Sequence, residues 1–212
     1  DVILSAAGSQ PGDLHKLWRT KTPGSYHMEY GYSCMGYEIP ASLGVKLADP
    51  SREVFVWVGD GTYLMNPTEI LTATQEGIKV NIIVVDNHGF GSIGSLSASI
   101  GSSGFGTHFN RRNKESGQLD GSRMVVDFAA NAASLGAEVF TPHSLGDFKD
   151  ALQRVRKLDH TSVIVVEADR DVKVPGYDSW WDVAVAETSE MPSVRKARKD
   201  YEIKRKNEKY HL

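Results

Sequence analysis

The chain has 212 residues, of which 40% are hydrophobic and 24% charged, a balance typical of a folded domain rather than a disordered chain. Its net charge of −3 argues against a nucleic-acid partner, and a single cysteine, Cys34, excludes an internal disulfide. The longest aliphatic run, Ile82 to Val85, is too short to cross a membrane, and the first residues lack the basic start of a signal peptide. We therefore expect a soluble, cytoplasmic domain with neither a membrane nor a nucleic-acid partner.

Short aliphatic segments alternate with helical patterns along the chain. Five segments read as strands, most of them continuously apolar as in strands covered on both faces: residues 2–6, 54–58, 80–85, 137–140 and 162–167. Between them, Asn66 and Pro67 mark one helix start, and Asp127 and Ser144 are candidate caps of two more. The last of these helices has four apolar residues on one face: Leu145, Phe148, Leu152 and Val155. The alternation predicts an α/β fold, a parallel sheet with helices on both faces.

Two stretches interrupt this alternation. Residues 89–106 hold six glycines and six serines, which indicates either a linker or a loop that covers a ligand. Residues 194–209 carry eight basic and three acidic side chains, and we expect an exposed helix there, docked through Val194, Ala197 and Tyr201. The chain enters its first strand at once, as a domain cut from a longer polypeptide would.

One glycine pattern, Gly89 to Gly94, matches the dinucleotide fingerprint G-x-G-x-x-G and follows a strand. That motif also needs a helix leading to a second strand that ends in an acid about 20 residues on. The downstream residues 111–115, Arg-Arg-Asn-Lys-Glu, show no strand pattern. The sequence therefore disfavours a dinucleotide site.

The second pattern is Gly59-Asp60-Gly61 at the end of one strand, followed by Asn87 at the end of the next. In a parallel sheet both loops emerge at the same edge, where α/β proteins bind ligands. A carboxylate, an amide oxygen and the carbonyl of Gly89 are hard donors suited to Mg²⁺, and so few ligands leave positions free for phosphate oxygens. The backbone N–H groups of Gly61 and Thr62 could face the same anion.

This constellation resembles the cofactor motif of the thiamine-diphosphate enzymes. The resemblance implies that Asp60, Asn87 and the Gly89 carbonyl hold Mg²⁺, which holds the diphosphate, with Gly59, Gly61 and Thr62 around it. Upstream, Ser33-Cys34-Met35-Gly36 looks like the segment that bends the cofactor in this family. There, the Met35 side chain would wedge between the two rings, and the Ser33 carbonyl would accept from the pyrimidine amine. The fold implied is the thiamine-diphosphate-binding fold.

Three further segments, 27–39, 117–121 and 174–183, resemble the hydrolases of bacterial inositol breakdown, over the C-terminal third of such enzymes. The resemblance implies cleavage of a C–C bond in a cyclic 1,2-diketone, trihydroxycyclohexane-1,2-dione, to 5-deoxy-glucuronate. It also implies a cofactor domain at residues 1–175, a C-terminal extension with a basic helix at 176–212, and N-terminal domains that this chain lacks.

In this family the glutamate that activates the cofactor lies on another domain, usually of a partner subunit. The resemblance thus implies a homodimer or tetramer with a shared site, no catalytic residue assignable in this chain, and an isolated chain that is inactive and binds cofactor weakly. Two alternatives stay open: a carboligase resembling acetolactate synthase, and a non-catalytic module that binds Mg²⁺ and a diphosphate. His88, between the two metal-loop residues, could face substrate or serve the structure, and Trp180-Trp181 could pack the extension.

Overall fold

A computed structural model describes residues 1–176 and 182–209, so Trp180 and Trp181 lie outside the described residues. The chain divides into two compact units. The first comprises residues 1–89 and 125–173, and the second comprises the described parts of 90–124 and 174–212.

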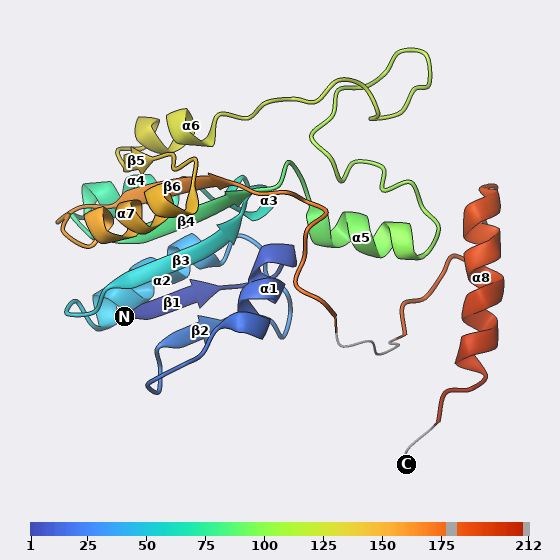
Figure 1. Ribbon diagram of the computed structural model, residues 1–212, viewed down its shortest axis with the longest axis horizontal. Coiled ribbons are helices and arrows are strands. Elements are labelled where there is room, and N and C mark those ends of the chain that lie inside the picture. Colours follow the sequence, from blue (N-terminus) through green and yellow to red (C-terminus); the bar gives the residue numbers. More distant parts are fainter. Residues whose placement is uncertain (177–181, 210–212) are drawn as a thin grey trace. The chain divides into compact units, whose positions relative to one another are not determined.

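The first unit is built on a parallel sheet (Figure 1). In the described residues the sheet has six strands: β1 (Val2–Ser5), β2 (Tyr26–Met28), β3 (Val54–Gly59), β4 (Asn81–Asp86), β5 (Glu138–Phe140) and β6 (Ser162–Glu167). Their order is β2-β1-β3-β4-β6-β5, and every neighbouring pair is parallel. The five predicted strands are confirmed. The short strand β2 was not predicted, because Tyr-His-Met carries no apolar run.

Helices cover both faces of this sheet, as predicted. The helices of the first unit are α1 (Ser9–Leu17), α2 (Glu38–Ala48), α3 (Asp60–Tyr63), α4 (Glu69–Gln75), α6 (Phe128–Ser134) and α7 (Leu145–Val155). On one face, α2 packs Ala41 and Val45 against Val2, Leu4 and Val54. On the other face, α1 and α7 contribute Leu14, Phe148 and Leu152 to a core that contains Ile3, Phe55 and Ile83. Alternate residues of β1 and β3 thus enter opposite cores.

The predicted helix starts are mostly confirmed. The Asp127 carboxylate accepts from the Ala130 N–H at 2.8 Å, and the Ser144 hydroxyl accepts from the Asp147 N–H at 3.1 Å. Helix α4 begins at Glu69, two residues later than a start at Pro67 predicts. On α7, Val155 is buried and Phe148 and Leu152 are partly buried, but Leu145 is 69% exposed because it lies at the first position of the helix.

The second unit holds two helices in its described residues, α5 (Gly91–Ser99) and α8 (Pro192–Arg205). Helix α5 lies within the stretch predicted as a linker or loop, so that prediction was wrong for residues 91–99. Glycine and serine weaken a helix without forbidding it. No strand follows α5 in the described part of residues 90–124, so the dinucleotide fold is absent there.

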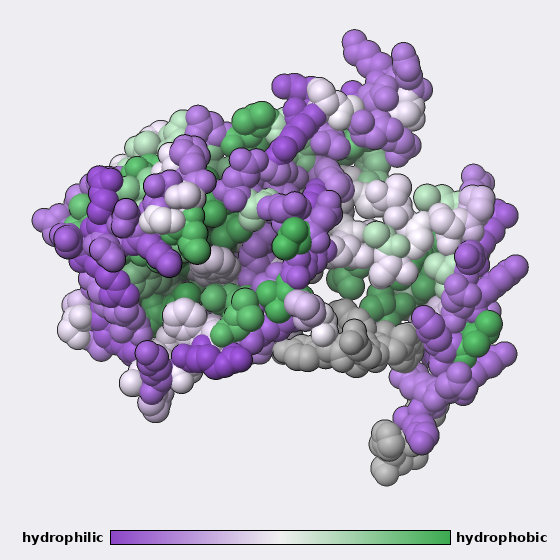
Figure 2. All heavy atoms as spheres, in the orientation of Figure 1, coloured by the Kyte–Doolittle hydropathy of each residue, from purple (hydrophilic) through white to green (hydrophobic). Residues whose placement is uncertain are grey.

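Helix α8 is the basic helix that the sequence predicted. Val194 and Tyr201 are buried against Val185, with Ile100 and Ala197 packed beside them. Its outer surface is mostly hydrophilic (Figure 2). Across residues 1–176 and 182–209, no helix has the length and apolar character needed to traverse a bilayer.

Candidate functional site

The predicted site residues lie at the carboxyl edge of the sheet, where the strand order reverses. From β1 the chain crosses to β2 on one side and then to β3 on the other, so the switch point lies between β1 and β3. The loops after β1, β2, β3 and β4 all emerge at this edge because the strands are parallel. Open α/β sheets bind ligands in the crevice at such a switch point.

Asp60 joins the loops after β3 and β4. It follows Gly59 directly, opens helix α3 and is 1% exposed. One carboxylate oxygen, Oδ2, accepts from the Gly89 N–H at 2.8 Å, and the other, Oδ1, accepts from the Gly61 N–H at 2.7 Å. The Gly61 N–H therefore holds Asp60 in place, whereas the sequence predicted that it would face an anion.

The Asn87 side chain places an oxygen close to both the Asp60 carboxylate and the Gly89 carbonyl. Its side-chain amide oxygen lies 2.9 Å from the Gly89 carbonyl oxygen and 3.1 Å from Asp60 Oδ1. Mg²⁺ holds its ligands at about 2.0–2.1 Å in an octahedron, so adjacent ligand oxygens lie about 2.9 Å apart. The two observed oxygen–oxygen separations are therefore close to the edge length of such an octahedron. Rotating the amide by 180° would place its NH₂ against the same two oxygens, so this geometry satisfies Asn87 with or without a cation.

The electrostatics of Asp60 also suit a cation. The pKa of Asp60 is raised to about 7, chiefly by burial and also by Asp86, while the N–H groups of Gly89 and Gly61 oppose the rise. A buried carboxylate without a counter-charge is costly, and a divalent ion would supply that charge. The described residues contain no group of three or more His, Cys, Asp or Glu side chains that could hold a metal. The candidate site here instead depends on one acid, one amide and one carbonyl.

The loop after β1 contributes residues that were not predicted. Gly8, whose φ of +141° requires glycine, turns the chain into α1, and Ser9 and Gln10 follow. The Ser9 hydroxyl lies 3.5 Å from Asn87 Nδ2, and a Cβ added at Gly59 would lie 3.3 Å from Gln10 Oε1. These contacts place the start of α1 beside the β3 and β4 loops. The available signal was a Gly-Ser pair just after a predicted strand.

The segment with Ser33 and Met35 reaches the same edge through β2. The Glu29 carboxylate accepts from the N–H groups of Tyr32 and Cys34, at 3.1 and 2.6 Å. Ser33 has φ +53°, and its carbonyl accepts from the Met35 N–H at 3.0 Å. Ser33 is exposed and Met35 half-buried.

The next residue links this segment to the β3 loop. At Gly36, with φ +87°, an added Cβ would lie 3.3 Å from Met65 Cβ and 3.7 Å from Asn66 Cβ. The Ser33–Met35 segment therefore packs close to the end of the short helix that Asp60 begins.

A second buried acid, Glu38, opens helix α2 immediately after this segment. It is fully buried, and neither carboxylate oxygen has a partner at hydrogen-bonding geometry among the described residues. Burial raises the pKa of Glu38 to about 7; the nearby N–H groups of Glu38 and Gly36 oppose the rise, and Glu29 adds to it. Sequence reasoning missed this residue, since a first-turn glutamate is usually an exposed helix former.

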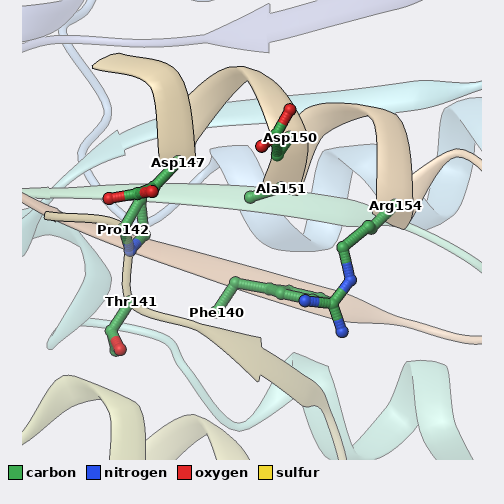
Figure 3. A pocket seen from close by; sticks show the side chains of 7 residues that line it. All are labelled: Phe140, Thr141, Pro142, Asp147, Asp150, Ala151 and Arg154. Atoms are coloured by element: carbon green, nitrogen blue, oxygen red, sulfur yellow. The ribbon is translucent and has the colours of Figure 1, made fainter. Parts of the chain in front are cut away.

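A separate pocket of about 260 Å³ lies at the end of β5 beside α7 (Figure 3). Its lining includes Asp147, Asp150 and Arg154, and the Arg154 guanidinium lies 4.7 Å from the centre of the Phe140 ring. None of the predicted site residues lines it. We therefore place the candidate site at the switch point.

The family model described as "Thiamine pyrophosphate enzyme, C-terminal TPP binding domain" matches residues 6–167, which include every residue of the switch-point loops. The chain belongs to this family. The prediction of a thiamine-diphosphate-binding α/β fold is thereby confirmed, and the chain is the cofactor-binding part of such an enzyme.

Curated relatives of this thiamine pyrophosphate-binding domain are named 3D-(3,5/4)-trihydroxycyclohexane-1,2-dione hydrolase. The protein of Bacillus cereus (strain AH820) is 46% identical over 206 residues, which are 97% of this chain and 32% of the relative. That of Bacillus thuringiensis (strain Al Hakam) is 45% identical over the same lengths. The chain thus spans about a third of the curated relatives it matches.

Solved structures agree on the fold. Benzoylformate decarboxylase from Polynucleobacter necessarius superposes with a TM-score of 0.67 at 20% identity, covering 82% of this chain and 31% of the other. A Rhodococcus jostii RHA1 thiamine diphosphate-dependent 4-hydroxybenzoylformate decarboxylase gives 0.65 at 23% identity, over 80% and 30%. At these identities the likeness shows the thiamine pyrophosphate-binding fold alone.

Proposed function

We propose that this chain anchors thiamine diphosphate through Mg²⁺ within an enzyme that hydrolyses a C–C bond of trihydroxycyclohexane-1,2-dione, in inositol breakdown in the cytoplasm. The convergence of three oxygens from Asp60, Asn87 and Gly89 carries the first part of the proposal. The 46% identity to hydrolases with that substrate in their name supports the second part.

The proposed metal ligands are the Asp60 carboxylate, the Asn87 amide oxygen and the Gly89 carbonyl. Three protein ligands leave octahedral positions of Mg²⁺ for diphosphate oxygens and water. The Gly61 N–H orients Asp60, and Gly59 leaves room for Gln10 beside the diphosphate. The backbone of Thr62 and the start of α1 would face the phosphates, since helix N-termini favour anions.

The Ser33–Met35 segment would bend the cofactor. Met35 would stand between its two rings, and the Ser33 carbonyl, which uses one lone pair for the Met35 N–H, would accept from the pyrimidine amine with the other. Thiamine diphosphate, when bound, supplies the nucleophilic carbon and the electron sink for C–C cleavage. The role of this chain is to hold and shape that group.

The proposed enzyme is a homodimer or tetramer that shares its site between subunits. The loop that carries Ser33 also exposes Tyr30 (60%) and Tyr32 (92%), large aromatic side chains of the kind found at protein interfaces. A covering domain from a partner subunit would supply the activating glutamate. We therefore expect the 212-residue chain alone to bind cofactor weakly and to turn over no cyclic dione.

The proposal is tested by calorimetry on the 212-residue chain at millimolar concentration. Mg²⁺ is supplied with thiamine diphosphate or with inorganic pyrophosphate, and Asp60→Ala, Met35→Ala and the control Asp150→Ala are compared. We expect Asp60→Ala to abolish binding of both ligands, Met35→Ala to weaken only thiamine diphosphate, and Asp150→Ala to resemble the wild type.

Two outcomes would contradict the proposal. An unaffected Met35→Ala variant would indicate a module that binds Mg²⁺ and a diphosphate without shaping the cofactor. For the activity, turnover of pyruvate but not of the cyclic dione by the enzyme with all its domains would indicate a carboligase.

A further inference from the structure

His88 has a backbone conformation that few side chains adopt. Its φ is +64°, in the left-handed region, and it lies between two proposed metal ligands, Asn87 and Gly89. Strained residues of this kind persist only where their surroundings hold them. The contacts of His88 therefore determine the conformation of residues 87–89.

Two strand ends hold the His88 residue. Its backbone N–H donates to Asp86 Oδ1 at 2.9 Å, and its ring atom Nδ1 lies 3.1 Å from the same oxygen. On the other side of the ring, Nε2 lies 2.9 Å from Glu167 Oε1 at the end of β6. The strand ends are themselves joined, since the Ala168 N–H donates to the Asp86 carbonyl at 2.8 Å.

The left-handed turn at this position explains how both neighbours reach one ion. Here the Asn87 amide oxygen and the Gly89 carbonyl oxygen are 2.9 Å apart. The turn at His88 brings these two oxygens to the spacing that one small cation needs.

We infer that His88 is a positioning residue, which fixes the loop of residues 87–89 in the geometry for Mg²⁺ and so sets the preference for Mg²⁺ over Ca²⁺. Mg²⁺ demands near-ideal octahedral geometry, whereas Ca²⁺ accepts longer and more variable distances. Without the contacts of His88 to Asp86 and Glu167, the positions of the loop oxygens become less fixed. The affinity for Mg²⁺ then falls more than the affinity for Ca²⁺. The inference rests on the proposed function, because it requires the metal to bind here.

The test is calorimetric titration of the 212-residue chain, at millimolar concentration, with Mg²⁺ or Ca²⁺ in the presence of thiamine diphosphate. His88→Gly removes the side-chain contacts and still accommodates φ +64°. We expect its Mg²⁺ affinity to fall about 10-fold or more, as is typical when the groups that orient metal ligands are lost, and its Ca²⁺ affinity to fall less. His88→Asn, which tolerates the left-handed region and can donate to Asp86, should retain an intermediate preference.

A matched control is a second histidine held between two acids. His160 lies 2.8 Å from Asp159 and 2.9 Å from Glu138, just before β6 at the opposite edge of the sheet. We expect His160→Gln to leave both metal affinities unchanged. Equal losses of Mg²⁺ and Ca²⁺ affinity in His88→Gly, or no loss, would overturn the inference and leave the proposed function standing, whereas a wild-type chain that binds neither metal with thiamine diphosphate would overturn both.

Discussion

The buried acid Glu38 should make the free energy of unfolding of this chain fall as the pH rises. Its carboxyl group is fully covered and has no hydrogen-bond partner among the described residues, so ionisation in the folded state is penalised. Burial raises its pKa from 4.5 to about 7. Glu38→Gln keeps the shape of the side chain and removes the charge.

The size and sign of the effect follow from linkage. Below pH 4.5 the carboxyl is protonated in both states, so it adds no pH-dependent cost. Between pH 4.5 and 7 the unfolded chain releases the proton and the folded chain keeps it, so the free energy of unfolding falls as pH rises. Each pH unit is worth about 1.4 kcal/mol, which gives a loss of about 3 kcal/mol by pH 7 and a constant penalty above it.

The assay is urea unfolding of wild type and Glu38→Gln from pH 4.5 to 8.5. The other ionisable groups largely cancel in the difference between the two proteins. We expect similar stability at pH 4.5 and a variant more stable by about 3 kcal/mol at pH 8. Parallel pH profiles would refute the reasoning, because they would mean that the Glu38 carboxylate has a favourable partner or access to water in the folded chain.

Two further predictions concern helix docking and capping. At Gly101, with φ +83°, an added Cβ would lie 2.5 Å from the Ser193 carbonyl oxygen. Gly101→Ala should therefore weaken the docking of α8 by about 1–3 kcal/mol. Faster amide exchange in residues 192–205 would measure this loss. Asp127→Ala should remove the cap of α6 and destabilise the chain by about 1 kcal/mol in urea, whereas Asp127→Asn should retain most of the cap; equal losses in both variants would contradict the capping role.

The metal loops could be predicted because their residues are chemically distinctive where they occur. A buried apolar strand that ends in Gly-Asp-Gly, and a second that ends near Asn87, place oxygen donors at a sheet edge whatever the rest of the chain does. The structure brings Asp60, Asn87 and Gly89 together as expected. Their role as metal ligands stays a prediction that the binding experiments test.

Other parts of the structure depend on contacts that the sequence does not display. Helix α5 forms in a stretch rich in glycine and serine, where intrinsic propensity alone predicts a loop. Glu38 reads as an ordinary first-turn acid, and only the packing of α2 shows that it is buried. His88 is distinguished by its φ and by Glu167, which is 79 residues away in the chain.

The three-residue strand β2 has consequences beyond its length. Without β2, β1 would be an edge strand, and the strand order would show no reversal between β1 and β3. The reversal sends α1, which follows β1, to the sheet face opposite α2, and α4, which follows β3, to the face where it contacts α2. Adjacent loops that leave toward opposite faces cannot fill the space between them. In this chain Gln10 of one loop lies beside Gly59 of the other, and β2 leads to the Ser33–Met35 segment at the same edge. The arrangement of the proposed cofactor site therefore depends on a strand that carries no sequence signal.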